Sequence, residues 1–202
     1  MTTAQFWFDP ICPWTYVTFR WLDAVRQVRP VVIEPRLLSL YYLNQGRDGV
    51  SHGEAHRASL NLERFLAWVR HEAGPDVMLK AYDFMGRSLF LEGDAADDEL
   101  VSETAATVGL DQVAAGAAAL DASWDEAILA DHYAAMSLVG DDVGSPVIAL
   151  GDGPAFFGPV LSRPLTGQAA GQVWDGCVAL ASQPAFFELK RSRGPAVKIA
   201  FE

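Results

Sequence analysis

The segment FDPICPWTY, residues 8–16, constrains the fold more than any other part of this sequence. The aromatic run Gln5–Phe8 is typical of a short buried strand. From Pro13 the hydrophobic period changes to three or four residues, which predicts an amphipathic helix that stops at Pro30. Proline is tolerated at the start of a helix because the first-turn amides have no partner to lose. Cys12 therefore stands where a strand passes into a helix.

The remaining sequence alternates strand signals with helix signals. In the second β-rich segment, Pro35 favours an edge strand or a strand end. The expected elements are, in order, a β segment over 31–40, a loop over 44–53, a helical block over 54–139, strands over 147–150 and 155–157, and a closing helix over 168–181. This order suits an α/β fold in which a small mixed sheet carries a helical insertion.

The helical block shows apolar residues at helical spacing. Three stripes are expected to face the core: Leu62, Phe65, Leu66 and Val69; Leu100, Val101, Ala105 and Val108; and Trp124, Ile128, Tyr133 and Met136. Gly74-Pro75, Gly93 and Gly109 are the expected helix stops. We therefore divide the chain into one domain, residues 1–53 and 140–202, and a helical insertion, residues 54–139, that covers one end of it.

Composition and charge exclude several classes of protein. The net charge of −11 argues against a nucleic-acid partner, because phosphates demand a basic face. No apolar run has the length of a membrane span, so no membrane partner is expected. The start, MTTAQFWFDP, lacks the basic and apolar regions of a signal peptide. Two cysteines are too few for a disulfide scaffold, which favours a reducing cytoplasmic location.

The position of Cys12 predicts a reactive thiol. A sulfur at a helix N-terminus faces unpaired amides and the positive end of the helix dipole, which favour the thiolate and lower the thiol pKa. The thiolate is the attacking species in disulfide exchange. The alternative is a buried and inert cysteine, which is the common fate of a lone cysteine.

Two short motifs favour the reactive interpretation. Residues 12–15, Cys-Pro-Trp-Thr, have the C-P-x-x form of a thiol oxidoreductase motif, with Thr15 where a resolving cysteine would stand. Residues 144–146, Gly-Ser-Pro, lie just before a predicted strand and are a candidate cis-proline loop. Such a loop would pack beside the sulfur and offer backbone groups to a bound thiol or disulfide.

These motifs and several longer segments carry a family resemblance. The segments are FWFDPICPWTYVTFRW from residue 6, LSLYYLNQGRD from 38, GDDVGSPVI from 140, AFFGPVLS from 155 and AGQVWDGCVALASQPAFFELKRSR from 170. With them the chain resembles the DsbA-type branch of the thioredoxin superfamily, and within it the actinobacterial mycothiol-dependent nitroreductase group. The resemblance extends over essentially the whole chain and is weakest through the middle helices.

The resemblance implies a fold, a cosubstrate and site residues. It implies a thioredoxin-like fold with an inserted helical subdomain, a thiol that exchanges with mycothiol, and reduction of electrophilic or nitro-aromatic molecules. By motif match Cys12 is the expected nucleophile and Pro146 the expected cis-proline. Thr15 is the third expected catalytic residue, because its hydroxyl can donate a hydrogen bond to the thiolate. The residues expected to bind substrate are Pro13, Trp14, Asn44 and Ser145. His56 is a further candidate, because it starts the helical block where a lid would face Cys12, and a surface position is its alternative.

One departure from the relatives sets the expected mechanism. They commonly carry C-P-W-C, so with Thr15 the motif cannot resolve its own mixed disulfide. Cys177 lies among apolar residues of a predicted helix, where a small hydrophobic role is expected. We therefore expect a monothiol enzyme, in which a low-molecular-weight thiol releases Cys12 and the Thr15 hydroxyl stabilises the thiolate.

Two alternatives stay open from the sequence. One is a glutathione-transferase-like or isomerase-like enzyme in which a bound thiol cofactor does the chemistry and Cys12 is dispensable. The other is a redox-inactive binding protein with an unperturbed thiol. His52 and His56 are four residues apart, but in a loop followed by a helix start such a pair is more typical of solvent-facing residues than of ligands, so no metal is expected. The aromatic segment 184–189 is a candidate contact for a homodimer.

Overall fold

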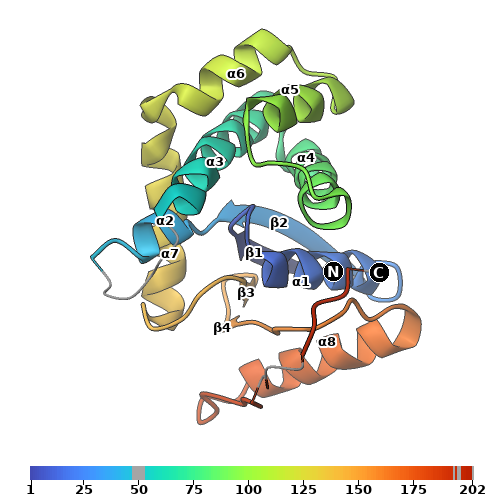
Figure 1. Cartoon of the computed structure of the whole chain (residues 1–202). Coiled ribbons are helices and arrows are strands. Elements are labelled where there is room, and N and C mark those ends of the chain that lie inside the picture. Colours follow the sequence, from blue (N-terminus) through green and yellow to red (C-terminus); the bar gives the residue numbers. More distant parts are fainter. Residues whose placement is uncertain (47–52, 193, 195–196, 202) are drawn as a thin grey trace.

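A four-stranded mixed sheet organises the molecule (Figure 1). The computed structural model describes residues 1–46, 53–192, 194 and 197–201, with the backbone alone for 53–56. The strands are β1 Thr2–Phe8, β2 Val31–Leu37, β3 Val147–Leu150 and β4 Ala155–Phe157, and their order in the sheet is β2-β1-β3-β4. β1 pairs with β2 in parallel and with β3 antiparallel, and β3 and β4 are antiparallel.

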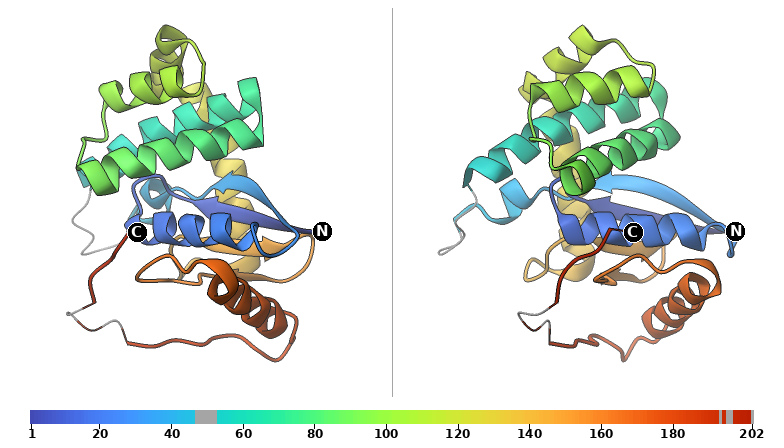
Figure 2. Two further views of the ribbon diagram at one scale, coloured as in Figure 1. Left: turned by 90° about the vertical axis from the view of Figure 1, so that its right-hand side faces the viewer. Right: turned by 45° about the vertical axis from the view of Figure 1, so that its right-hand side comes forward.

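Helices cover the sheet in separate groups. Their bounds are α1 Pro13–Val25, α2 Leu40–Leu43, α3 Gly53–Ala73, α4 Pro75–Arg87, the π-helix η1 Ser88–Glu92, α5 Asp98–Thr107, α6 Gln112–Leu120, the 3₁₀ helix η2 Ala122–Trp124, α7 Asp125–Val139 and α8 Gly167–Ala181. Figure 2 shows α3 to α6 gathered on one side of α1 and the sheet, with α8 on the other side of α1. α7 runs from the α3–α6 group down to the sheet (Figure 1).

The alternation of side chains along β1 builds two cores. Phe6 and Phe8 are fully buried in the larger core, which α1, α3 and α4 also fill. Trp7 points to the opposite face, into a smaller core that contains Ala135 of α7. Its indole Nε1 donates a hydrogen bond to the Asp131 carbonyl oxygen at 2.9 Å. Successive residues of a strand face opposite sides, so this short aromatic strand anchors helices on both faces of the sheet.

The α/β fold expected from the sequence is confirmed, with shifts at some element ends. β2 is an edge strand and carries Pro35 opposite Phe6, so the missing amide disturbs no inner ladder. β2 ends at Leu37, and Leu40, the last residue of the predicted β segment, is the first residue of α2 instead. α1 ends at Val25, several residues before Pro30, in a series of turns. Much of the predicted loop 44–53, namely residues 47–52, lies outside the described residues.

The helical block follows the predicted stops and two of the three predicted stripes. Gly74, Gly93 and Gly109 end helical segments with positive φ angles of 86°, 85° and 77°. The third stripe is partly wrong, because the Tyr133 side chain is 63% exposed. The buried residues of α7 are Ile128, Asp131, His132 and Ala135. They follow the i, i+3, i+4, i+7 spacing of one helix face. The apolar pattern of the sequence did not predict this face, because two of its four residues, Asp131 and His132, are polar.

α7 contacts both the sheet and the helices above it. It packs on β1, β2 and β4 and also on α3. The Asp131 carboxylate joins these parts by accepting hydrogen bonds from the Leu37 amide at 3.0 Å and from the Arg70 guanidinium. The division into a domain of residues 1–53 and 140–202 and an insertion of residues 54–139 stays a prediction. Over the part of the chain that the structure describes, no helix combines the length and apolar character needed to cross a bilayer.

A close approach of α4 to α1 gives a stability prediction. A Cβ atom on Gly86 would lie 2.2 Å from the Tyr16 ring, which is itself fully buried. We expect Gly86→Ala to lower the free energy of unfolding by about 1–3 kcal/mol, because the ring has no free space to move into. Urea denaturation measures the change. Gly116→Ala in α6 is the control, since its Cβ meets nothing within 4 Å and should be neutral or stabilising.

Candidate active site

Cys12 is the N-cap residue of α1. Its backbone is extended, with φ −83° and ψ 109°, and Pro13 follows as the first helical residue. The Cys12 carbonyl oxygen accepts the first helical hydrogen bond, from the Tyr16 amide at 3.1 Å. The Cys12 amide donates to the Asp9 carbonyl oxygen at 3.1 Å, which closes the turn between β1 and α1. This geometry holds the thiol at the positive end of the helix.

A cis-proline loop lies against the sulfur. The Ser145–Pro146 peptide bond is cis, as the sequence predicts. The Cys12 thiol donates to the Ser145 carbonyl oxygen at 3.8 Å. The Thr15 and Ser145 hydroxyl oxygens are 2.7 Å apart, and Thr15 is fully buried. The two motifs meet because β3 begins right after the loop and runs antiparallel to β1, with Val147 opposite Trp7.

The ionisation of Cys12 differs from the prediction. Burial raises the pKa of the Cys12 thiol, and the charge of Asp9 adds to this rise. Hydrogen bonds with Ser145 and Thr15 act in the opposite direction but do not outweigh burial. The prediction of a lowered pKa is therefore wrong for the free protein. The helix terminus is present, but the residue is only 8% exposed, and removal of water disfavours the thiolate.

The predicted substrate-binding residues fall into two groups. Pro13 and Trp14 are half-buried beside Cys12, and Ser145 contacts it directly. Asn44 is half-buried at the C-terminal end of α2, where its amide Nδ2 donates to the Leu40 carbonyl oxygen at 2.9 Å. His56 lies in α3, but its side chain is outside the described residues. The binding roles of all five residues stay predictions.

Cys177 is a separate, shielded thiol. It lies half-buried in α8 and packs at the edge of the larger core. Burial raises its pKa to about 11, so it is a weak nucleophile at neutral pH. Both cysteines are free thiols. In the described residues no group of three potential metal ligands comes together.

Three buried polar residues, from the β1–α1 turn, α3 and α4, received no role from the sequence. Asp9, Glu63 and Tyr82 are all fully buried. The Tyr82 ring stacks on Phe8, with ring centroids 4.0 Å apart, and Cys12 is the largest charge influence on its pKa. A signal for Glu63 was its place within the apolar stripe of α3, next to Leu62. Charged residues are rarely fully buried without a partner, and neither carboxyl oxygen of Glu63 has a hydrogen-bond partner among the described residues.

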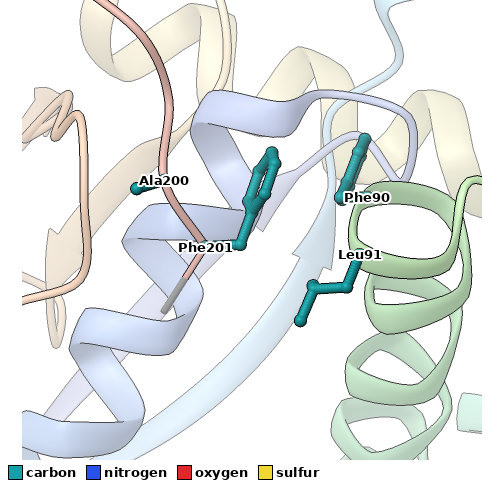
Figure 3. Close-up of a pocket in the computed structure, with 4 residues that line it drawn as sticks. All are labelled: Phe90, Leu91, Ala200 and Phe201. Atoms are coloured by element: carbon teal, nitrogen blue, oxygen red, sulfur yellow. The ribbon is translucent and has the colours of Figure 1, made fainter.

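An open pocket lies along the flank of α1. Phe90, Leu91, Ala200 and Phe201 line it, and its volume is about 350 Å³. Figure 3 shows the rings of Phe90 and Phe201 close to parallel, with centroids 5.3 Å apart. Both rings also contact Tyr16, one helical turn after Cys12, at 5.4 and 6.1 Å. The C-terminal segment thus returns to the helix that carries the thiol.

The fold and this site together define a thiol oxidoreductase of the thioredoxin fold. Solved structures share the architecture. A probable DsbA oxidoreductase, SCO1869 from Streptomyces coelicolor, is similar over 98% of both chains, with a TM-score of 0.61 and 19% identity. The cytosolic disulfide reductase DsbM from Pseudomonas aeruginosa with GSH matches 88% of this chain and 96% of its own, with a TM-score of 0.59 and 17% identity.

Sequence comparison identifies the family within this class of protein. Residues 11–191 match the model of the Rv2466c-like family, described as mycothiol-dependent nitroreductase Rv2466c. The uncharacterized protein Rv2286c of Mycobacterium tuberculosis is 32% identical over 203 residues, which cover 97% of this chain and 84% of that relative. The chain belongs to the Rv2466c-like mycothiol-dependent nitroreductase family.

Proposed function

We propose that this enzyme works through Cys12 alone and exchanges with mycothiol in the cytoplasm of an actinobacterium. The observation that carries the proposal is Thr15, which occupies the fourth position of the C-P-x-x motif, where a resolving cysteine would stand, and whose hydroxyl oxygen lies 2.7 Å from that of Ser145. A threonine hydroxyl cannot close a disulfide with Cys12. The family description supports mycothiol as the thiol, and the mycobacterial relative supports the source.

The proposed cycle balances with two molecules of thiol. The Cys12 thiolate attacks one sulfur of a disulfide substrate, a new S–S bond forms at Cys12, and the second sulfur leaves as a thiol after taking up a proton. Mycothiol then attacks this mixed disulfide and frees Cys12, and the product leaves as a disulfide with mycothiol. A second mycothiol releases the remaining substrate half as a thiol, so the substrate gains two electrons and mycothiol disulfide forms.

Small electrophilic and nitro-aromatic molecules are the other proposed acceptors. Reduction of a nitro group to a nitroso group needs two electrons and two protons, which oxidation of two mycothiols to their disulfide provides, and water leaves. The pocket lined by Phe90 and Phe201 has an aromatic surface that an aromatic ring can contact. Both rings contact the ring of Tyr16, a residue one helical turn after Cys12, which supports this pocket as the place where such a ring binds.

A comparison of reductants tests the proposed function. The purified enzyme is mixed with a nitro-aromatic acceptor or an aliphatic disulfide, and with mycothiol, glutathione or coenzyme A at equal concentration. We expect turnover with mycothiol and at least tenfold less with the other two thiols. Equal rates with all three thiols would contradict a mycothiol-specific role, and no turnover with any of them would contradict the thiol cycle.

Homodimer formation stays a separate proposal. Within the segment 184–189 the side chains of Phe187 and Leu189 are 91% and 78% exposed. Large apolar side chains at this exposure are available for contact with a second copy. Light scattering of the wild type and of a Phe187→Ser, Leu189→Ser double variant tests the proposal. It predicts a dimer mass for the wild type and a monomer mass for the variant, and a wild-type monomer contradicts it.

A further inference from the structure

A positive charge without a counter-charge lies on the flank of α1, beside the aromatic pocket. The Arg20 guanidinium lies over the Tyr16 ring, with its Cζ atom 5.9 Å from the ring centroid, and its Nη1 donates to the Tyr16 hydroxyl at 3.4 Å. Arg20 is half-buried, and no carboxylate of the described residues forms an ion pair with it. A guanidinium that is positioned in this way can bind an anionic ligand.

Two carboxylates on the adjoining helices are already engaged by other arginines. On α4, the Asp83 carboxylate accepts a hydrogen bond from the Arg87 Nε at 3.0 Å. On α1, the Asp23 carboxylate forms an ion pair with Arg26 at 2.5 Å. Each of these carboxylates is thus balanced by one arginine. Arg20 is left as one excess positive charge, in a chain whose net charge is −11.

The Tyr16 ring connects this charge to the aromatic pocket. Phe90 and Phe201 contact the same ring, with centroids at 5.4 and 6.1 Å, and they line the pocket beside α1 (Figure 3). Among the described residues, the charged ones nearest in sequence to the pocket are Glu92 and Lys198, which are exposed and opposite in sign. An aromatic surface and an excess guanidinium charge therefore meet at one buried ring.

The geometry of α1 relates this charge to the thiol. Cys12, Tyr16 and Arg20 are spaced four residues apart, so they follow one side of the helix with a rise of about 6 Å from each to the next. Side chains on a helix lean toward its N-terminus, and the Arg20 guanidinium accordingly lies at the level of Tyr16. Only one helical turn along α1 therefore separates the guanidinium from the residue that carries the thiol.

We propose that the aromatic acceptors of this enzyme are acids, whose ring binds against Phe90 and Phe201 and whose carboxylate binds the Arg20 guanidinium, with the reducible group toward Cys12. This inference rests on the proposed function and names the class of its aromatic substrates. A planar carboxylate matches two N–H groups of a guanidinium, and such hydrogen bonds between charged groups are stronger than neutral ones. The ring contacts supply affinity, and the arginine selects for the charge.

An acid and its neutral analogue test the role of Arg20. 4-Nitrobenzoate and 4-nitrobenzamide share the ring and the nitro group and differ in charge. For each enzyme variant we take the ratio of kcat/KM for the acid to kcat/KM for the amide, with mycothiol as reductant, so that a loss of folded enzyme cancels. We expect this ratio to fall about tenfold in Arg20→Gln, the size of a hydrogen-bonded charge contact. Arg26→Gln, which changes an exposed arginine on the same helix, should leave the ratio unchanged.

Binding without mycothiol gives a readout that does not depend on reduction. Isothermal titration calorimetry with the same two compounds measures their dissociation constants. Arg20→Gln should weaken the acid about tenfold relative to the amide, whereas Phe90→Leu should weaken both by a similar factor, because both lose a ring contact. Added salt should weaken the acid and leave the amide unaffected, since salt screens the charge of a half-buried arginine.

The outcomes separate this inference from the proposed function. A tenfold fall of the acid-to-amide ratio in Arg20→Gln, with no fall in Arg26→Gln, supports the carboxylate site. Equal ratios in the wild type and Arg20→Gln overturn that site, while the thiol cycle stands if an aliphatic disulfide is still reduced. A wild type that reduces neither nitro compound nor an aliphatic disulfide overturns the thiol cycle, and the ratio of dissociation constants then still decides the role of Arg20.

Discussion

Replacement of Cys12 by serine is expected to reduce mycothiol-dependent turnover by at least about 10³-fold, because the variant keeps the fold but loses the nucleophile. Cys12 is 8% exposed and its thiol donates to the Ser145 carbonyl oxygen at 3.8 Å, so a serine hydroxyl fits the same space. Steady-state rates with an aliphatic disulfide and with a nitro-aromatic acceptor measure the loss. Both should fall together if one sulfur serves both reactions.

The matched control is Cys177→Ser. This thiol lies in α8, and burial raises its pKa to about 11, so we expect unchanged rates after its removal. Retained activity in Cys12→Ser would point to a different mechanism. A Cys12→Ser enzyme that keeps most of its activity would favour a transferase-like or isomerase-like mechanism, in which a bound thiol cofactor does the chemistry.

A second cysteine at position 15 is expected to change the type of cycle. Residues three apart in the first turn of a helix lie about 5–6 Å from each other, within the range that a disulfide can bridge. In Thr15→Cys the new thiol attacks the Cys12 mixed disulfide within the molecule, so the lifetime of the adduct without added thiol should fall by about 10³-fold or more. Intact-mass spectrometry then shows loss of two hydrogens in place of the adduct.

Thr18→Cys is the control for this experiment. Thr18 is buried one turn further along α1, where its hydroxyl bonds to the carbonyl oxygens of Trp14 and Pro159 rather than to the cis-proline loop. We expect its Cys12 adduct to persist as in the wild type. A stable adduct in Thr15→Cys as well would mean that position 15 is not the resolving position, which would contradict the monothiol interpretation of Thr15.

Much of the fold was predictable because local signals agreed. The change of hydrophobic period at Pro13 located α1, and glycine stops located the ends of the helical segments. Pro35 correctly indicated an edge strand. The face of α7 was misjudged at Tyr133, since Asp131 and His132 are buried there. Asp131 is satisfied by groups far away in the sequence, such as Arg70 and the Leu37 amide, and a local pattern does not contain that information.

The site was predictable only in part. Short motifs identified Cys12 and the cis bond at Pro146, and the pairing of β3 with β1 brought them together. The direction of the Cys12 pKa was not predictable, because it depends on how deeply the surrounding helices bury the sulfur. The burial of Asp9 was equally hidden, since the groups that bond to its carboxylate come from the β1–α1 turn, from α2 and from α3.

Intact-mass spectrometry of the wild type and Cys12→Ser, after incubation with mycothiol disulfide across a pH series, shows whether Cys12 is the reacting thiol. We expect one mycothiol adduct on the wild type alone, with a formation rate that rises with pH as the buried thiol ionises. Reduction by excess mycothiol should remove the adduct completely. Absence of an adduct on the wild type, or equal labelling of Cys12→Ser through Cys177, would contradict a monothiol enzyme that acts through Cys12.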